Sequence, residues 1–265
     1  RDSVRALHEQ AKATGAKIVH CAGYDSMPSD LLSLLAVDAL RAAGQQCSRC
    51  IVAYDLLGTL GYMSSGTLLS IVAIMRHLHA TPADIPDALD PLCLCEPRPP
   101  RSTTQRVLAA LTGGDAWVLP GWSPALNAWH FFFGMAAANT RIVRRSRHLL
   151  GDVPAHFAYY EVMSCGGGAV GLAIALASSL GYALCLPLLL LPPVRWLLTK
   201  CVPPGLGPSP SMQAAGRWRC EVAADGADGN GGLMRVRGSV VGLGQDPGYK
   251  STSMMAAQTA LCVAE

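Results

Sequence analysis

Hydrophobic residues near the start of the chain follow first a helical spacing and then a strand-like run. In residues 4–14, Leu7 and Ala11 share one face of a predicted helix, and Gly15 ends it. The next apolar run, residues 17–21, is short and stops at a glycine-containing stretch, which predicts a β-strand. Helices and strands in alternation are typical of an α/β fold.

Residues 31–43 form the second predicted helix, and their apolar positions lie on most of its sides. Ser29 or Asp30 is expected to cap its start, and Gly44 ends it. A helix that is apolar nearly all round is buried in a core. We therefore expect this helix to be covered on most of its faces.

The rest of the chain alternates between further strands, helices and turns. The patterns predict a hairpin loop over residues 225–232, helices over 68–78 and 254–263, and strands over 49–57, 217–223 and 233–243. This mixture of elements predicts an α/β (α+β) fold with a mixed sheet.

The most informative stretch joins the predicted strand to the second predicted helix. It reads Gly23, Tyr24, Asp25, Ser26, Met27, Pro28, Ser29 and Asp30. A strand that stops at a glycine and continues in small and polar residues forms a loop at the carboxyl end of a sheet strand, and ligands of open α/β sheets sit at that edge. The alternative is a plain strand stop with a helix cap, because most carboxylates in such loops are caps or turn formers.

A second turn rich in small residues opens the predicted helix 68–78. Gly66 and Thr67 follow Ser64 and Ser65 there, and the free N–H groups of a helix start favour an anion or a polar ligand. The alternative, which we favour for this turn alone, is a simple Ser/Thr N-cap.

A third turn, residues 246–249, precedes the final predicted helix. It combines Asp246, Pro247 and Gly248 with Tyr249, whose hydroxyl is a candidate polar contact. Because Asp-Pro-Gly is turn chemistry, the alternative is a plain turn and helix cap.

An uncharged stretch covers residues 162–194, and residues 169–191 are almost wholly apolar. As one straight helix the apolar part would be about 34 Å long, against roughly 30 Å of bilayer hydrocarbon. Gly181 and Tyr182 divide it into two short halves, as in a re-entrant hairpin. Basic residues stand on both sides, where they suit anionic headgroups on a single face: Arg141, Arg144, Arg145, Arg147, Arg195 and Lys200.

These features favour contact with a membrane or lipid surface within one leaflet. The alternative is a buried core helix. More than 18 consecutive apolar residues are rarely needed for a soluble core, so the lipid interpretation is the one we favour.

Composition narrows the class of protein. The 265-residue chain has room for one large domain or two small ones, its charged residues make up only 15%, and its mean hydropathy is +0.29. A net charge of +3 is too small to favour nucleic acid as a partner. Ten scattered cysteines favour a reducing, intracellular compartment. We expect no metal site. The only spacings that suggest metal ligands are a lone C-x-x-C at residues 47–50, a His pair at 77–79 and a Cys pair at 93–95, and they are weak evidence.

Six short motifs follow one another along the chain. They are His8-Glu9-x-Ala11, residues 23–30, Gly66-Thr67, Ile142-Val143-Arg144-Arg145, Gly207-Pro208-Ser209 and Asp246-Pro247-Gly248-Tyr249. In this order they resemble the saccharopine dehydrogenase-like oxidoreductases. The resemblance implies a Rossmann domain followed by a mixed α/β domain, with the final helix packing back on the first. Animal members of that family are associated with lipid droplets and membranes, and mycobacterial members act as trans-acting enoyl reductases in lipid synthesis.

The resemblance also implies a function and a site. It implies an NAD(P)-dependent reductase that acts on a lipid-like substrate at an intracellular membrane or lipid-droplet surface. The cofactor would be NADP or NAD, contacted by Gly23, Tyr24, Asp25, Ser26 and Pro28. Candidates for the substrate cleft are Asp30, Gly66, Thr67 and Tyr249, and no catalytic acid or base is assigned. The alternative is a non-catalytic lipid-surface scaffold that retains the family fold, and a homodimer is a further assembly to test.

One element of the family pattern is missing from its expected place. The glycine-rich dinucleotide fingerprint should precede residues 23–30, and we expect none in this chain, since Gly166, Gly167 and Gly168 lead into the lipophilic stretch. We therefore expect a fragment that is inactive alone, with its cofactor-binding half upstream.

The expected division of the chain follows from these assignments. Residues 1–45 would end a Rossmann domain, 46–161 would begin a substrate domain, 162–200 would associate with a membrane, 201–245 would form the hairpin of the substrate domain, and 246–265 would form the final helix.

Overall fold

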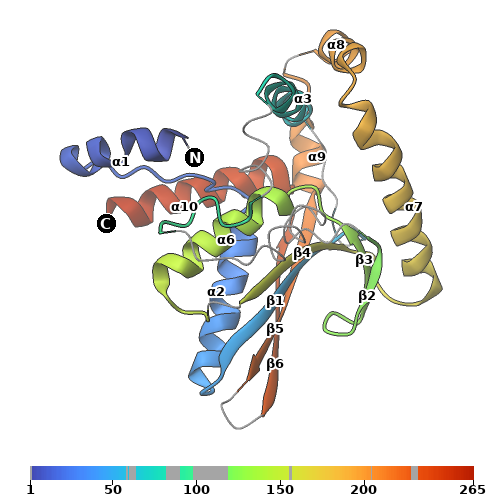
Figure 1. Cartoon of the computed structure of the whole chain (residues 1–265). Helices are drawn as coiled ribbons and strands as arrows, with labels where there is room; N and C mark the ends of the chain where they lie inside the picture. Colours follow the sequence, from blue (N-terminus) through green and yellow to red (C-terminus); the bar gives the residue numbers. More distant parts are fainter. Residues whose placement is uncertain are drawn as a thin grey trace.

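A single six-stranded mixed sheet organises the molecule, as Figure 1 shows for this computed structural model. The structure describes residues 2–57, 59, 64–81, 90–97, 119–154, 157–203, 205–227 and 232–265. The strands are β1 (Gln46–Asp55), β2 (Gly121–Ser123), β3 (Ala128–Phe132), β4 (Ala158–Ser164), β5 (Arg217–Ala227) and β6 (Leu233–Leu243), in the spatial order β2-β3-β4-β1-β5-β6. Only β1 and β4 run parallel, and the other neighbours are antiparallel. The predicted mixed α/β fold is confirmed.

Helices lie on both faces and at one end of this sheet. They are α1 (Asp2–Thr14), α2 (Met27–Ala42), α3 (Ser65–Ala80), α6 (Ala136–Leu150), α7 (Gly168–Leu188), α8 (Pro192–Cys201), α9 (Pro210–Ala215), the short η2 (Pro247–Ser251) and α10 (Thr252–Ala264). Helix α2 packs on β1, β5 and β6, and α6 packs on β4, whereas α7 packs on β3. In Figure 1, α2 and α6 lie on one side of the sheet and α7 on the other.

The main core lies between α2 and the centre of the sheet. Alternate residues of β5, among them Trp218, Cys220 and Val222, point into this core together with Leu40 of α2. That alternation is the expected pattern of a strand with one buried face. It confirms the predicted strand over 217–223, and β6 has the predicted bounds. Strand β5 continues to Ala227, and the rest of the predicted hairpin loop lies mainly outside the described residues.

The strand predicted over residues 17–21 is wrong. Residues 16–22 have no regular secondary structure, and Ile18 and Val19 are 59% and 52% exposed. A strand needs a hydrogen-bonding neighbour, and the six-stranded sheet does not include this segment. Cys21 has a φ of 60°, a left-handed conformation in which an extended strand cannot continue.

The start and the burial of α2 also differ from expectation. The helix begins at Met27 after the N-cap residue Ser26, whose side chain makes no cap hydrogen bond, so neither predicted cap residue has that role. Leu31 and Leu35 are 48% and 64% exposed, whereas Leu32 and Leu40 are buried. Only the face that packs on the sheet is covered, and the apolar residues on the other side remain in contact with solvent.

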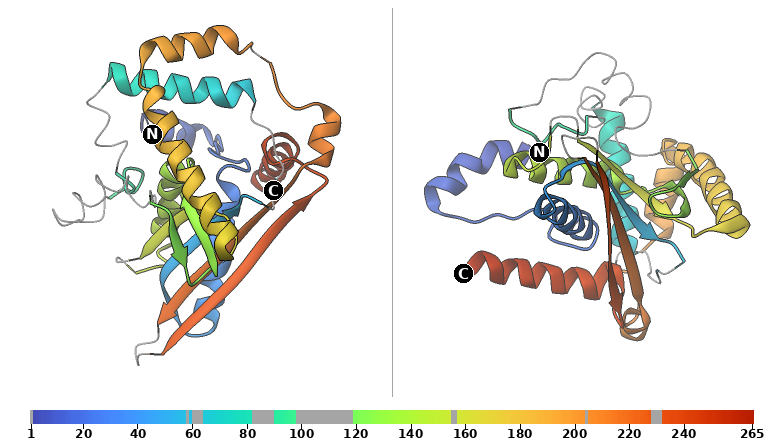
Figure 2. Two further views of the ribbon diagram at one scale, coloured as in Figure 1. Left: turned by 90° about the vertical axis from the view of Figure 1, so that its right-hand side faces the viewer. Right: turned by 90° about the horizontal axis from the view of Figure 1, so that it is seen from below.

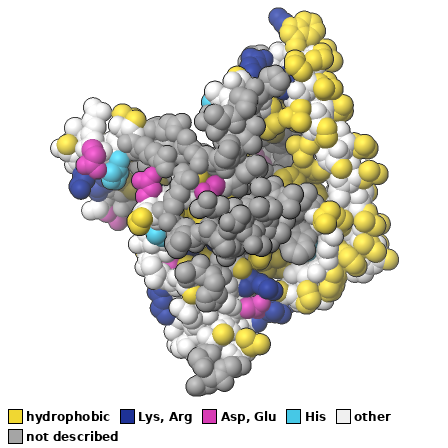
Figure 3. Space-filling view, viewed as in Figure 1, with side chains coloured by type: hydrophobic (Ala, Val, Ile, Leu, Met, Phe, Trp, Pro, Cys, Tyr) yellow, Lys and Arg dark blue, Asp and Glu magenta, His cyan; other side chains and the backbone are white. Residues whose placement is uncertain are grey.

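Helix α7 forms one continuous helix through Gly181, so the predicted hairpin at this position is wrong. The chain turns only after Leu188, before α8 begins at Pro192. The alternative of a buried core helix is wrong as well, because only Gly171 and Ala175 of α7 are buried. Figure 3 shows hydrophobic side chains along the outer margin of the molecule over α7 and α8.

The end of the chain returns to its beginning. Tyr24 N donates to Thr252 Oγ1 at 3.1 Å, Thr259 Oγ1 contacts Met27 Sδ at 3.5 Å, and Lys17 Nζ donates to Val263 O. Figure 2 shows α10 running beside the segment that precedes α2. The domain boundaries expected from the sequence stay a prediction.

Candidate functional site

Residues 23–26 form a tight turn that leads into α2, and aromatic rings pack against this turn. Tyr24 is only 7% exposed, and its ring meets those of Trp218 and Tyr54 edge to face at centroid distances of 4.9 and 5.8 Å. An ideal Cβ at Gly23 would lie 2.9 Å from Thr252 Cγ2, so α10 closes directly over this glycine. The turn is thus fixed by packing from β1, β5 and α10, while the Asp25 side chain remains exposed.

Asn139 of α6 joins this turn to the sheet. Ser26 Oγ donates to Asn139 Oδ1 at 2.9 Å, and Asn139 Nδ2 donates to the carbonyl oxygen of Asp25. The same amide nitrogen donates to Glu161 Oε2 at 3.0 Å. Asn139 and Glu161 are fully buried. One amide therefore connects the turn's backbone, its serine and a carboxyl group of β4.

Glu161 is the buried acid of this network. Tyr159 OH donates to Glu161 Oε1 at 2.6 Å. Burial raises the pKa of Glu161 to about 8, although hydrogen bonds from Tyr159, Asn139 and Ser29 act in the opposite direction. At pH 7 the group is therefore mostly protonated, and the core holds no net charge at this point.

A second set of polar contacts fixes the first turn of α2 and the end of α6. Ser146 Oγ donates to Asp30 Oδ2 at 2.9 Å, and burial raises the pKa of Asp30. Arg147 and Asp152 form an ion pair of 2.7 Å whose side chains are 2% and 3% exposed. Asp30 thus serves the packing of α2 against α6.

Gly66 and Thr67 lie at the exposed start of α3. Ser64 Oγ accepts a hydrogen bond from Thr67 N at 3.0 Å, which confirms the favoured interpretation of an N-cap. Ser65 N donates to Leu206 O at 2.8 Å, so the loop before α9 touches this helix start.

Tyr249 packs on that same loop. An ideal Cβ at Gly207 would lie 2.5 Å from Tyr249 OH, so the tyrosine hydroxyl lies directly against this glycine. The Asp246 carboxylate is buried and accepts from Tyr249 N and Lys250 N, both at 3.0 Å. The turn-and-cap interpretation of residues 246–249 is confirmed, and the turn is held between α9 and α10.

The structure therefore connects the predicted site residues in two groups. Gly23, Tyr24, Asp25, Ser26, Pro28 and Asp30 lie at the turn and the first turn of α2, in contact with the start of α10. Gly66 and Thr67 reach this group only through the loop at 206–207 and Tyr249. Tyr24, Ser26 and Pro28 are buried. Their assignment as cofactor contacts stays a prediction.

Sequence reasoning missed the residues that hold the turn in place, Asn139, Tyr159 and Glu161. The available signal was a single carboxyl group inside the otherwise uncharged strand β4. Such a group, two residues from a tyrosine, lies on the same face of the strand as that tyrosine.

The expectation that this chain lacks the dinucleotide spacing is wrong for residues 166–171. Gly166, Gly168 and Gly171 follow β4 in the order G-x-G-x-x-G and open α7. The first two have φ values of 76° and 68°, and an ideal Cβ at Gly171 would lie 2.3 Å from Gly166 O, so local geometry requires all three glycines.

The context does not fit a dinucleotide. The chain continues from α7 into α8 and not into a parallel strand, and position 186, where an acidic partner of the ribose is expected, is Leu186.

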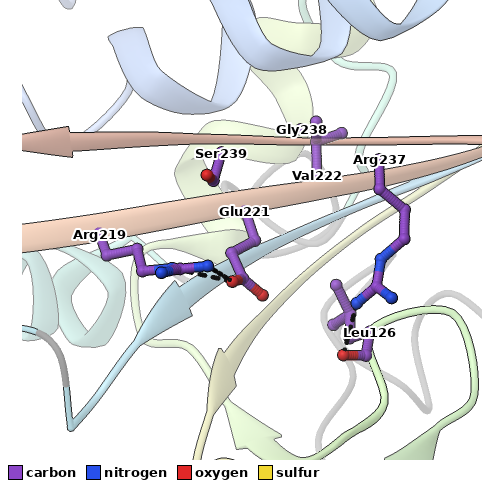
Figure 4. Close-up of a pocket in the computed structure, with 7 residues that line it drawn as sticks. All are labelled: Leu126, Arg219, Glu221, Val222, Arg237, Gly238 and Ser239. Carbon is purple, nitrogen blue, oxygen red and sulfur yellow. Dashed lines mark hydrogen bonds and ion pairs between the residues drawn. The ribbon is translucent and has the colours of Figure 1, made fainter.

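A shallow pocket of about 250 Å³ lies on the open face of β5 and β6. Its lining residues, drawn in Figure 4, are Leu126, Arg219, Glu221, Val222, Arg237, Gly238 and Ser239. Arg219 Nε donates to Glu221 Oε1 at 2.8 Å, and Arg237 donates to the carbonyl oxygen of Leu126 at 2.8 Å. The charged groups of the pocket are therefore paired within the protein, Arg219 with Glu221 and Arg237 with a backbone carbonyl.

The cysteines offer no reactive centre in the core. All ten thiols are free, and burial raises the pKa of Cys47 and Cys165 to about 11 and that of Cys220 to about 12. A thiol with such a pKa is a poor nucleophile at neutral pH. Within the part of the chain that the structure describes, no three His, Cys, Asp or Glu side chains are placed to hold a metal ion.

Comparison with curated proteins finds relatives that align with the whole chain. A Mycobacterium tuberculosis protein whose name assigns it provisionally to the trans-acting enoyl reductases is 34% identical over 288 aligned residues, which cover 100% of this chain and 62% of that relative. Trans-acting enoyl reductases of Mycobacterium bovis and Mycobacterium ulcerans are 30% identical over 281 and 278 residues, with the same coverage. No family model matches the chain, and no solved structure matches it significantly.

The placement among saccharopine dehydrogenase-like proteins stays a prediction. The chain spans about 62% of the length of the curated relatives that it matches. Over that length, the chain is similar to proteins named trans-acting enoyl reductases.

Proposed function

We propose that a protein of the relatives' length that contains this chain is a nicotinamide-dependent reductase of enoyl groups. The observation that carries the proposal is the similarity to named trans-acting enoyl reductases, which extends over 100% of the chain at 30–34% identity. A nicotinamide supplies a hydride when it is bound, and the protein supplies binding and orientation. Reduction of an enoyl double bond consumes that hydride and one proton.

This chain would supply the substrate side of the site. Asp25 is the exposed side chain of the turn, and Asn139 holds its backbone carbonyl. A turn fixed in this way can present a backbone or carboxylate contact without reorganisation, which is how a rigid scaffold positions bound groups. The glycines at 166–171 do not fit a dinucleotide, so they have no part in the proposal.

We propose further that the enzyme works at a lipid surface, with α7 and α8 as its contact. Among the described residues, α7 is the one helix long and apolar enough to cross a membrane, with a mean hydropathy of 2.0 and 11% of it buried. Exposed apolar side chains continue onto α8 with Trp196 and Leu197, which are 60% and 53% exposed. Apolar patches of this extent on a protein surface mark sites of interaction.

The sheet topology favours a helix lying in one leaflet over a span. Strands β4 and β5 flank the segment in sequence, and both are hydrogen-bonded to β1 in one sheet. A single crossing by α7 would place them on opposite sides of the bilayer. Helix α8 has 10 residues, so it is about 15 Å long and too short to return across roughly 30 Å of hydrocarbon.

The five arginines expected to meet lipid headgroups are engaged inside the protein, whereas Lys200 at the end of α8 is exposed. Arg144 donates to Phe157 O at 3.0 Å, Arg145 donates to Leu94 O at 2.6 Å, and Arg195 is buried against carbonyls at the end of α7. The proposed attachment therefore rests mainly on apolar area, with Lys200 as the one exposed cation of this set.

The reductase proposal is tested with the protein of the relatives' length and an enoyl thioester. We expect oxidation of NADPH or NADH that requires the thioester, with one nicotinamide oxidised for each double bond reduced. Absence of nicotinamide binding at millimolar concentration would contradict the proposal. For this chain alone we expect no tight binding, and submicromolar affinity would contradict that expectation.

The second candidate is a non-catalytic lipid-surface scaffold. It is favoured by the burial of Tyr24, Ser26 and Pro28, which leaves few side chains of the turn to contact a ligand. Lipid binding without nicotinamide binding in the longer protein would support the scaffold and exclude the reductase.

A further inference from the structure

Strand β6 forms an open edge of the sheet along its whole length. It has 11 residues and, within the described part of the chain, is hydrogen-bonded on one side only, to β5. Figure 2 shows this strand at the margin of the sheet. A long edge strand presents a row of backbone N–H and C=O groups to another strand, and proteins usually protect such edges with short length, proline or inward charges.

Strand β6 also carries exposed apolar side chains. Leu233 and Leu243, at its two ends, are 85% and 74% exposed, and Met234 and Val241 are 41% and 48% exposed. The strand contains no proline. Its charged residues, Arg235 and Arg237, are engaged within the protomer by Asp225 and by Leu126 O.

The sequence of β6 is complementary to itself in the antiparallel direction. With a twofold axis at Gly238, all 11 residues find a partner in a second copy. Leu233 then stands opposite Leu243, and Val236 opposite Val240. Arg235 faces Val241, and Arg237 faces Ser239, so no arginine stands opposite another.

Antiparallel pairing of two β6 strands about a neighbouring residue is less favourable. An axis at Arg237 would set two guanidinium groups directly opposite one another, which destabilises a strand pair. An axis at Ser239 would pair only residues 235–243 and leave Leu233 unpaired. Of these three registers, the one centred on Gly238 alone pairs the complete strand, and it sets Leu233 opposite Leu243 and Val236 opposite Val240.

The same symmetry preserves the two faces of the sheet. Val236 and Val240 point toward α2 and pack against the core, while Arg235 and Arg237 point to the open face. About this axis, even-numbered residues pair with even-numbered residues and odd-numbered with odd-numbered. Because side chains alternate along a strand, the covered face of one copy then continues into the covered face of the other. Helix α2 of each copy would therefore cover the same face of a continuous twelve-strand sheet.

We infer that β6 is the interface of a symmetric homodimer, in which two copies pair antiparallel through this strand about Gly238. The partner is a second copy of this chain, because the strand's own sequence sets Leu233 opposite Leu243 and places no arginine opposite another. The contact is isologous, as closed twofold dimers require. It does not depend on the proposed reductase activity.

The test compares two double variants of the full 265-residue chain that differ only at position 233. In L233E/L243E, like charges face one another twice across the seam. In L233K/L243E, opposite charges face one another at the same two places. Within one protomer the two positions lie at opposite ends of the strand, so neither pair interacts there.

Sedimentation in a mild detergent, which covers α7, measures the dissociation constant of the dimer. We expect the wild type to dimerise, L233E/L243E to weaken the dimer about tenfold or more, and L233K/L243E to restore it. Hydrogen exchange should show β6 amides protected in the dimer and less protected in L233E/L243E. A monomeric wild type, or equal dissociation constants for the two variants, would overturn the inference. A monomeric wild type would leave the β6 edge to a different partner protein, and equal dissociation constants would mean that the copies associate through another surface, such as α7.

Discussion

Two regions of this molecule reverse the usual distribution of polar and apolar groups. Beneath the turn at 23–26, the polar side chains of Asn139 and Glu161 are buried in the core. On α7 and α8, which together hold about 45 Å of helix, leucines and a tryptophan are exposed at the surface. The buried polar groups have their partners within the chain, and the exposed apolar groups do not.

The difference shows where the fold is complete and where it needs a partner. A buried polar group is tolerated when its hydrogen bonds are made, and Glu161 accepts from Tyr159 and Asn139. Helix α7 packs on β3 through one face, but its outward leucines, such as Leu180 and Leu184, are more than 60% exposed and add little to the stability of the fold. Changes in the first region should therefore affect stability, and changes in the second should affect only binding to a lipid surface.

The largest expected effect is the loss of the buried ion pair at the end of α6. Arg147→Met leaves the Asp152 carboxylate buried without its partner at 2.7 Å, and we expect the free energy of unfolding to fall by about 3–5 kcal/mol. Arg41, which is 3.8 Å from the same carboxylate but 56% exposed, provides the control. Arg41→Met should cost less than about 1 kcal/mol in urea denaturation. Equal losses would show that the buried pair has no special role.

The buried acid should give the protein a distinctive pH dependence. The pKa of Glu161 is raised from its ordinary value of 4.5 to about 8, so the folded state binds the proton more tightly and loses stability as pH rises through this window. Burial lowers the pKa of His130 from 6.5 to about 4, which acts in the opposite direction only below about pH 6.5. Between pH 6.5 and 8 we therefore expect a fall of roughly 2 kcal/mol.

Denaturation of Glu161→Gln isolates this contribution. The neutral amide should remove the fall between pH 6.5 and 8, since no proton is then released from the core. Glu221→Gln, on the open face of β5, should retain it. A slope that persists in Glu161→Gln would show that another group causes it.

A smaller effect is expected from the tyrosines of the two regions. Tyr159→Phe removes the hydroxyl that donates to Glu161 at 2.6 Å, and the free energy of unfolding should fall by about 1 kcal/mol. Tyr182→Phe on α7 is the control. It keeps the ring that packs against Phe131 and Phe132, and it should change the free energy of unfolding by less than about 0.5 kcal/mol. A similar loss in both variants would remove the contrast between the regions.

The smallest effect on folding is expected on α7 itself. Leu180 and Leu184 are 61% and 62% exposed, so Leu180→Gln/Leu184→Gln should shift the free energy of unfolding in detergent by less than about 0.5 kcal/mol per site. A loss of several kcal/mol in thermal or urea denaturation would mean that these leucines pack within the protein.

Local patterns were sufficient to predict much of the fold. The alternation in residues 217–223 and 233–243 predicted β5 and β6, because one face of this hairpin packs on α2 and the other stays open. The segment 17–21 had the same apolar appearance but found no partner strand. Pairing is a property of the whole sheet, so the segment's own residues could not reveal it.

The site was less accessible to sequence reasoning. The caps at Ser64 and Asp246 were predictable because each bonds to backbone only three or four residues away. The link from Ser26 through Asn139 to Glu161 joins residues more than one hundred positions apart, and the packing of α6 on both α2 and β4 brings them together. The four arginines before α7 had the composition of a headgroup contact, yet the fold uses them to hold α6 in place.

Flotation with neutral phosphatidylcholine vesicles tests the lipid-surface account most directly. We expect the full chain to float without anionic lipid and to remain bound at high salt, because its attachment is apolar. Leu180→Gln/Leu184→Gln should reduce binding at least about tenfold. Leu31→Gln/Leu35→Gln, which alters two leucines exposed to 48% and 64% on α2, should bind as the wild type does. A wild type that never floats, or equal losses in both double variants, would contradict the account.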